Sequence, residues 1–389
     1  MNPDNQPPRD QRGFSIVELL VATSLMLIVM SSVFQTLHPV HGAFRTEPEA
    51  ADLQQRLRVA ADALYRDVLA AGNGLNQGSR AGPLTDFLAP ILPLRQGRRT
   101  ADAAGTFKTS TITLLTLDRG AAQTTIAQPL VARSATATLN LDPGCPPADP
   151  TCGFKTGTAV VVFDDTGAYD TFTVTSIDAA GLHLQHNMRD STKTYAANTS
   201  RIAAAGSRTY YLKSDATTNT FQLMRYDGEG AADAPVVDHV VGLSFQYFGD
   251  PQPPTMRRPL TEPAGPWTTY GPKPSVSGDN CVFVGNGTAM PTPTLPVIGA
   301  GEALVPLSAA MLTDGPWCPD AVNPNRFDAD LLRLRRVRVT LRVESAAASL
   351  RGPAGPLFAH AGSSSGGHSF LPDHEIRFDV APRNLNLQR

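Results

Sequence analysis

Residues 13–22 read GFSIVELLVA, and this stretch decides how the rest of the chain is organised. A polar leader, residues 1–13, precedes a long apolar run, residues 14–37, in which Glu18 is the only formally charged residue. A helix over that run is roughly 36 Å long at about 1.5 Å per residue, and the hydrocarbon core of a bilayer is roughly 30 Å thick. The run therefore predicts a helix that crosses a membrane or forms the apolar spine of a helical assembly.

The position of Glu18 is the most specific signal in the sequence. An acidic side chain deep in a bilayer costs about 2.5–3.5 kcal/mol, so it normally has a partner and a function. Glu18 lies four residues after Phe14, which directly follows Gly13. This arrangement resembles the N-terminus of type IV prepilins, whose class III signal is shared by the pseudopilins of type II secretion. The resemblance implies that a prepilin peptidase cuts between Gly13 and Phe14 and methylates Phe14, and that Glu18 attracts the N-terminal amine of a neighbouring subunit.

The leader predicts how the chain sits in the membrane. An ordinary secretory signal is cut after its apolar core, whereas the expected cut here precedes the apolar run, so that the run is retained. Arg9 and Arg12 supply the positive charge expected on the cytoplasmic side, although Asp4 and Asp10 dilute it. We expect a single-pass inner-membrane protein with a cytoplasmic N-terminus and a periplasmic head, which later reaches a pilus at the cell surface.

The composition is that of a globular protein with a balanced charge. The 389 residues are 41% apolar and 17% charged, with a net charge of −2, so the charge gives no indication of a nucleic-acid partner. All four cysteines follow the apolar run, and an oxidising periplasm would allow two disulfides among them. Four cysteines permit three connectivities, of which we favour the local pairs Cys145–Cys152 and Cys281–Cys318.

The residues after the apolar run predict a second helical segment. Pro39 and Gly42 are expected to interrupt the helix, because proline lacks the amide hydrogen and clashes with the preceding turn. Thr46 and Glu49 have the spacing of a capping box, with which a new helix would start. Apolar residues then recur at three- and four-residue steps, which predicts an amphipathic helix over 46–72 that packs on a sheet.

Residues 73–389 predict a periplasmic head rich in β-strands. Residues 249–330 are rich in proline and glycine, and we expect them to be a long loop insertion that carries the second disulfide. The predicted fold is therefore α+β and pilin-like, with a long N-terminal helix packed on antiparallel sheets. Short runs of Val, Thr, Ile and Phe predict strands at Thr109–Leu117, Thr158–Phe163, Thr171–Ile177 and Leu182–His186, and a hairpin of Arg208–Lys213 with Phe221–Tyr226. One longer strand is predicted over Val236–Phe248, and further strands over Leu332–Glu344 and Phe370–Val380.

The order of these elements resembles the W-type minor pilins and the J-type minor pseudopilins. Val236–Tyr247 is similar to their central strand, and Leu334–Val343 is similar to the strand before their terminal hairpin. The pair Arg383-Asn384 is similar to their usual C-terminal ending. This second resemblance covers about half of the chain beyond residue 75.

Sequence signals for catalysis or metal binding are weak. Residues 362–366 formally match the G-x-S-x-G motif around Ser364, but no strand–turn–helix pattern surrounds them. Acidic loop clusters near Asp164 and Asp227 lack EF-hand spacing, so we favour solvated turns over calcium sites at both places. We expect no enzyme activity, no resident metal and no cofactor.

These observations favour a minor pilin of a type IV pilus that is incorporated into the filament near its tip or primes it. Its expected partners are the prepilin peptidase, other major and minor pilins, and the inner-membrane assembly platform. The first alternative is a minor pseudopilin of a type II secretion system. The second is a membrane-anchored adhesin or binding protein whose site lies within residues 249–330.

Overall fold

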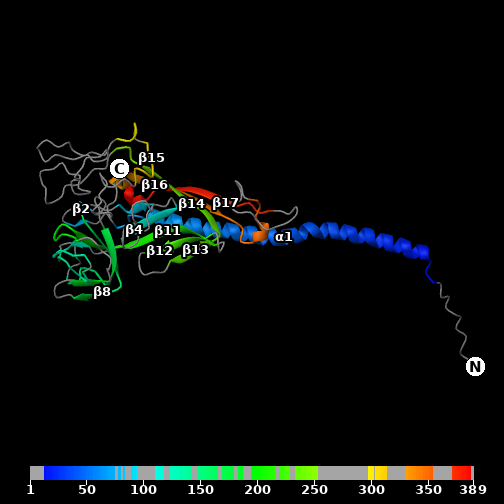
Figure 1. The fold of residues 1–389 in the computed structure, drawn as a ribbon, viewed down its shortest axis with the longest axis horizontal. Coiled ribbons are helices and arrows are strands. Elements are labelled where there is room, and N and C mark those ends of the chain that lie inside the picture. Colours follow the sequence, from blue (N-terminus) through cyan, green and yellow to red (C-terminus); the bar gives the residue numbers. More distant parts are fainter. Residues whose placement is uncertain are drawn as a thin grey trace, which may run out of the picture.

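One helix, α1 (Ile16–Ala70), enters the head with its C-terminal part and projects far beyond the head at its N-terminal end (Figure 1). Its C-terminal part lies among the β-sheets. The computed structural model describes residues 13–74, 78–79, 82–83, 89–94, 110–117, 123–132, 134–141, 145, 148–164, 169–178, 183–186, 194–215, 220–227, 233–252, 297–301, 303–312, 329–353 and 370–386.

The helix continues through Pro39 and Gly42, so the predicted interruption and the predicted restart at Thr46 are wrong. A proline within a helix removes one hydrogen bond and costs about 3 kcal/mol, which is a local penalty. The turns on either side keep their own hydrogen bonds and hold the 55-residue helix together. The expected segments 14–37 and 46–72 are therefore two parts of one helix, which ends two residues before Gly72.

Two antiparallel sheets flank the C-terminal part of α1. The predicted hairpin is confirmed as β11 and β12, which pair from Thr209 with Tyr226 to Asp215 with Thr220. The five-stranded sheet has the order β13 (Ala234–Asp238), β12 (Thr220–Tyr226), β11 (Gly206–Asp215), β4 (Thr111–Thr116) and β3 (Ile91–Pro93). The four-stranded sheet has the order β15 (Val305–Leu307), β14 (Val240–Gly249), β16 (Leu334–Val343) and β17 (His374–Val380), and the short η4 (Arg383–Leu385) follows it.

The helix and both sheets share one apolar core. Leu53, Ala60, Leu64 and Val68 of α1 are fully buried, and their seven- and four-residue steps place them on one face of the helix. Alternate residues of β16 point into the same core, which confirms the period-two pattern expected for this segment.

The predicted single strand Val236–Phe248 is wrong, because the structure divides it into β13 and β14. His239 separates them with a φ of +59°, and the two strands belong to different sheets. A left-handed residue redirects the chain sharply, so this one position sends the backbone from one sheet to the other.

The predicted loop insertion 249–330 contains regular structure in its described parts. Strand β15 pairs with β14, and η2 (Ala329–Arg333) leads directly into β16. The fully buried Arg333 forms an ion pair with Asp330 and donates a hydrogen bond to the carbonyl of Pro251 at 3.1 Å. These contacts join the two ends of the insertion. The predicted pair Cys281–Cys318 lies outside the described residues.

A third sheet of six strands lies between β4 and β11 in the sequence. The disulfide Cys145–Cys152 belongs to this region and confirms the predicted local pair. The sequence predicted three of its strands but missed the shorter and more polar ones. The order of the six-stranded sheet is β5 (Gln123–Thr125), β10 (Arg201–Ala204), β7 (Ala159–Phe163), β8 (Tyr169–Asp178), β9 (His183–His186) and β6 (Thr136–Thr138). The two-residue strands β1 (Gly78–Ser79) and β2 (Gly82–Pro83) pair with each other as a separate sheet.

A buried carboxylate anchors the end of α1 to the five-stranded sheet. Asp67 accepts a hydrogen bond from the hydroxyl of Tyr210 at 2.6 Å and forms an ion pair with Arg208. Tyr210 is fully buried, and its burial together with this hydrogen bond raises the pKa of its hydroxyl. Apolar contacts are not directional, whereas this polar contact fixes the rotation of the helix on the sheet.

We predict that Asp67→Ala lowers the free energy of unfolding by about 2 kcal/mol, because the substitution leaves the buried hydroxyl of Tyr210 without its acceptor. Asp62 forms an exposed ion pair with Arg66 on the same helix, so Asp62→Ala is the matched control and is expected to cost about 0.5 kcal/mol or less. Urea unfolding of the detergent-solubilised protein measures both values. Equal losses for the two variants would contradict the anchoring role.

A second carboxylate anchors α1 nearer to its exposed half. Glu49 accepts hydrogen bonds from the hydroxyl of Ser345 at 3.0 Å and from the amides of Ala346 and Ala347, which lie between β16 and η3 (Ala348–Leu350). Burial acts to raise the pKa of Glu49, but the hydrogen bonds outweigh it and lower that pKa overall. Glu49 therefore holds the helix to the end of β16 instead of capping a new helix.

We predict that this anchor weakens in acid. Because the pKa of Glu49 in the folded protein is below its ordinary value of 4.5, the contact stabilises the fold above that value and is lost as the pH falls through the folded-state pKa. Glu49→Gln should reduce the fall in unfolding temperature between about pH 5 and pH 3, whereas Glu47→Gln at an exposed neighbouring position should not. Identical pH profiles for all three proteins would exclude the effect.

Candidate functional site

The peptide bond between Gly13 and Phe14 lies in an open segment just before α1. The side chain of Phe14 is 91% exposed, and no atom lies within 4 Å of the position that a Cβ of Gly13 would occupy. Ser15, the N-cap residue, has extended backbone angles, with φ of −69° and ψ of 143°. The expected cleavage residues therefore lie outside the helix and next to its first turn.

Ser15 and Glu18 form a capping box at the start of α1. The Ser15 hydroxyl accepts a hydrogen bond from the amide of Val17 at 3.3 Å, and the Glu18 carboxylate accepts one from the amide of Ser15 at 2.9 Å. The negative charge of Glu18 also suits the positive end of the helix dipole. The sequence carried this signal in its S-x-x-E spacing, although we assigned a capping box only to Thr46 and Glu49.

Glu18 keeps acceptor capacity beyond this hydrogen bond. A carboxylate offers about four acceptor sites on its two oxygens, and the amide of Ser15 occupies one of them. A cationic group from outside the helix can therefore approach the carboxylate without displacing the cap. This geometry brings Gly13, Phe14 and Glu18 together at one end of the molecule, as their spacing predicted.

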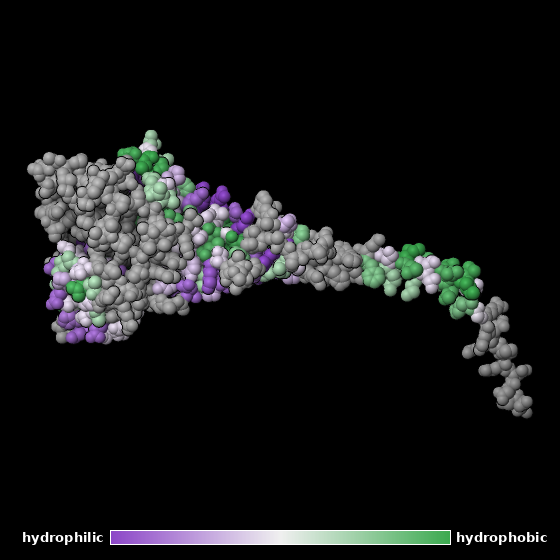
Figure 2. All heavy atoms as spheres, in the orientation of Figure 1, coloured by the Kyte–Doolittle hydropathy of each residue, from purple (hydrophilic) through white to green (hydrophobic). Residues whose placement is uncertain are grey.

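The first five turns of α1 form an apolar surface that no described part of the chain covers. Figure 2 shows this segment as an apolar rod that extends away from the more polar head. Ile16–Phe34 is long and apolar enough to cross a membrane, and none of it is buried within the described parts of the molecule. The hydroxyls of Thr23, Ser24 and Ser32 bind backbone carbonyls of the same helix, so they need no other partner. Such a surface requires lipid or other apolar helices around it.

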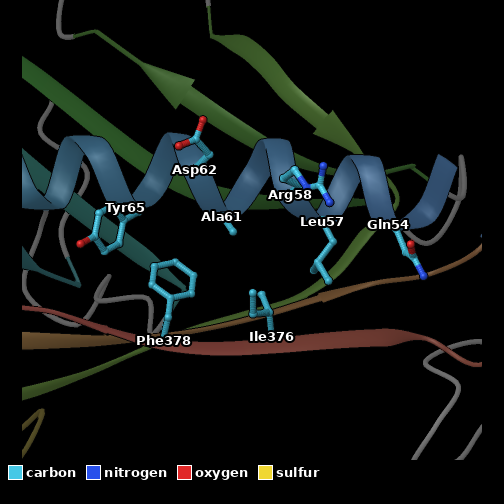
Figure 3. Close-up of a pocket in the computed structure, with 8 residues that line it drawn as sticks. All are labelled: Gln54, Leu57, Arg58, Ala61, Asp62, Tyr65, Ile376 and Phe378. Carbon is cyan, nitrogen blue, oxygen red and sulfur yellow. The ribbon is translucent and has the colours of Figure 1, made fainter. Parts of the chain in front are cut away.

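A shallow groove lies on the head between α1 and the edge strand β17 (Figure 3). Apolar side chains of both elements line it, with the rings of Tyr65 and Phe378 6.2 Å apart, and Arg58 and Asp62 are also among the lining residues. The lining contains no histidine, cysteine or serine. The groove therefore offers a largely apolar packing surface.

Other titratable side chains in the described parts of the chain have partners within the head. His183 binds the hydroxyl of Thr138 at 3.0 Å, and the buried Asp170 accepts a hydrogen bond from Tyr195 at 2.8 Å. Within the described ranges, no group of three or more His, Cys, Asp or Glu residues could hold a metal ion. Ser364 lies outside those ranges.

Comparisons with known proteins bear on the N-terminus alone. Residues 8–34 match the family model described as the prokaryotic N-terminal methylation motif. No curated protein sequence matches the chain. Among solved structures, the Phage phi92 endosialidase is similar over 35% of this chain and 27% of its own, with 12% identity and a TM-score of 0.15. The chain thus spans about a quarter of that protein, and so low a score carries no argument about fold or function. The match at residues 8–34 indicates that the chain carries a type IV prepilin-like class III signal, as pilins and pseudopilins do.

Proposed function

We propose that this protein is a minor pilin of a type IV pilus. The observation that carries the proposal is the exposed apolar start of α1, whose sequence matches the methylation motif and whose single charge is Glu18. The prepilin peptidase cuts between Gly13 and Phe14 and methylates the new N-terminus at Phe14. The retained helix then joins the apolar core of the filament, where other pilin helices cover it.

Glu18 sets the position of the subunit in this assembly. A carboxylate among apolar helices is unfavourable by about 2.5–3.5 kcal/mol unless it is paired. The amine released at the N-terminus of a neighbouring subunit is the cation that cleavage creates, and pairing with it offsets the burial of Glu18. Cleavage therefore supplies the partner that the carboxylate needs.

The head occupies the periplasm before assembly. The disulfide Cys145–Cys152 is compatible with that oxidising compartment. The pilin-like fold, with α1 packed on antiparallel sheets, belongs to this proposal, as does the relation to the W-type minor pilins. A head that carries a six-stranded sheet in addition to the two that pack on α1 suits a position near the filament tip better than a repeating shaft. The inner-membrane assembly platform and the other pilins are the partners that this role requires.

We predict that Glu18→Ala leaves cleavage intact but lowers the amount of this protein in sheared filaments at least tenfold, because the carboxylate can no longer pair with the neighbouring amine. Ser24→Ala is the matched control, since the Ser24 hydroxyl binds the carbonyl of Leu20 in its own helix at 2.7 Å. Immunoblots of filament and membrane fractions from the native host measure both variants. Normal incorporation of Glu18→Ala would contradict the proposed role of the carboxylate.

Deletion of the whole chain distinguishes a role in a type IV pilus from a role in a type II secretion system, because subunits of both carry this signal. Loss of surface pili with normal export of proteins supports the pilus. Normal pili together with exoproteins retained in the periplasm would assign the chain to a type II secretion system instead.

A further inference from the structure

The chain makes a long excursion between two strands that lie side by side. Thr116 at the end of β4 is paired with Gly206 at the start of β11, so residues 117–205 leave the five-stranded sheet and return to the same place. Leu117 and Ala205 still pack against the main core. The whole six-stranded sheet lies within this excursion.

The six-stranded sheet closes on itself. The two strands at the ends of its order, β5 and β6, are joined by backbone hydrogen bonds from Asn140 to Thr125 at 2.9 Å and from Ala127 to Thr138 at 2.7 Å. Ile126 and Leu139 form an antiparallel bridge between the same two segments. The sheet is therefore a small antiparallel barrel, which leaves neither β5 nor β6 as an open edge.

The barrel has an apolar core separate from the core around α1. Val160 and Val162 of β7 point into it, whereas the alternating Val161 and Phe163 point outward. Cys152 of the disulfide is fully buried in this second core.

Within the described residues, a few apolar side chains on the outer wall of the barrel pack against the rest of the head. Val161, Phe163 and Ala203 on the outer wall of the barrel belong to the main core. No strand of the barrel pairs with a strand of the two sheets around α1 within the described residues. Elsewhere the outer wall carries polar side chains such as Thr136, Ser176 and Gln185, all exposed to solvent.

The geometry points to a self-contained module: residues 118–204 fold as a β-barrel that the scaffold of α1 and its two sheets carries but does not need. The barrel lies at the end of the head remote from the N-terminus of α1, near the label β8 in Figure 1. Its function is therefore separate from filament assembly, which uses the opposite end of the molecule. The separation of folding stands on the structure alone, and the statement about assembly rests on the proposed function.

Hydrogen exchange of the full-length protein in detergent tests the separation of folding. Phe172→Ala removes a buried side chain from the barrel core, and Phe245→Ala removes one from the main core, so each variant is the control for the other. We expect Phe172→Ala to speed exchange about 100-fold in peptides of residues 123–204, with less than a threefold change in β14, β16 and β17. Phe245→Ala should give the reverse pattern. Equal acceleration of both regions in either variant would overturn the module.

A deletion tests the statement about assembly. Residues 118–204 are replaced by Asn-Gly, a two-residue hairpin turn that joins Leu117 to Ala205 in the register of β4 and β11. We expect the shortened chain to keep the far-ultraviolet signal of α1 and of the two sheets around it, to lose only the contribution of the barrel strands, and to enter filaments within about twofold of the full-length level. A folded deletion variant that is absent from filaments into which the full-length chain does assemble would refute this inference. Absence of the full-length chain as well would instead refute the proposed function.

Discussion

Helix α1 has to be stable both outside the head, where its apolar side chains are exposed, and inside the head, where it packs on two sheets. The arrangement of the rest of the molecule depends on that constraint. Its N-terminal part exposes apolar side chains all round, whereas its C-terminal part exposes one face and buries the other in the head. A single continuous helix transmits position from one part to the other because its backbone hydrogen bonds are internal and its rise per residue is fixed. Whether Ile16–Phe34 lies in lipid or among other apolar helices therefore determines where the head is placed.

The head holds this helix by a combination of apolar packing and two carboxylates. Packing supplies most of the favourable free energy, but it permits sliding and rotation. Asp67 fixes the end of the helix to the five-stranded sheet, and Glu49 fixes it to the end of β16 in the four-stranded sheet. The third carboxylate, Glu18, lies in the exposed part and caps the helix in its own chain. Each acidic side chain thus has a different kind of partner. Asp67 binds a tyrosine hydroxyl and an arginine, Glu49 binds a serine hydroxyl and backbone amides of the head, and Glu18 binds a backbone amide of its own helix end.

The sequence predicted what depends on local pattern and failed where distant residues decide. The apolar run, most of the longer strands and the disulfide Cys145–Cys152 follow from periodicity and spacing, and the structure confirms them. The continuity of the helix through Pro39 did not follow, because a local penalty is outweighed by the turns around it. The partners of Glu49 lie far from it in the chain, and the left-handed turn at His239 depends on the sheets that its neighbouring strands join. Local sequence patterns therefore predict neither feature. The position of Gly13 and Phe14 just before the helix and of Glu18 in its first turn follows from local spacing, because these residues lie within six positions of one another.

Mass spectrometry of filaments sheared from the native host tests the central claim most directly. We expect a peptide that begins at Phe14 and carries one N-terminal methyl group, because cleavage and methylation both precede incorporation into a pilus. Filament peptides that retain residues 1–13, or chains found only with that leader in the membrane fraction, would contradict the claim. The helix would then be a permanent anchor, and the pairing assigned to Glu18 would have no amine to form it.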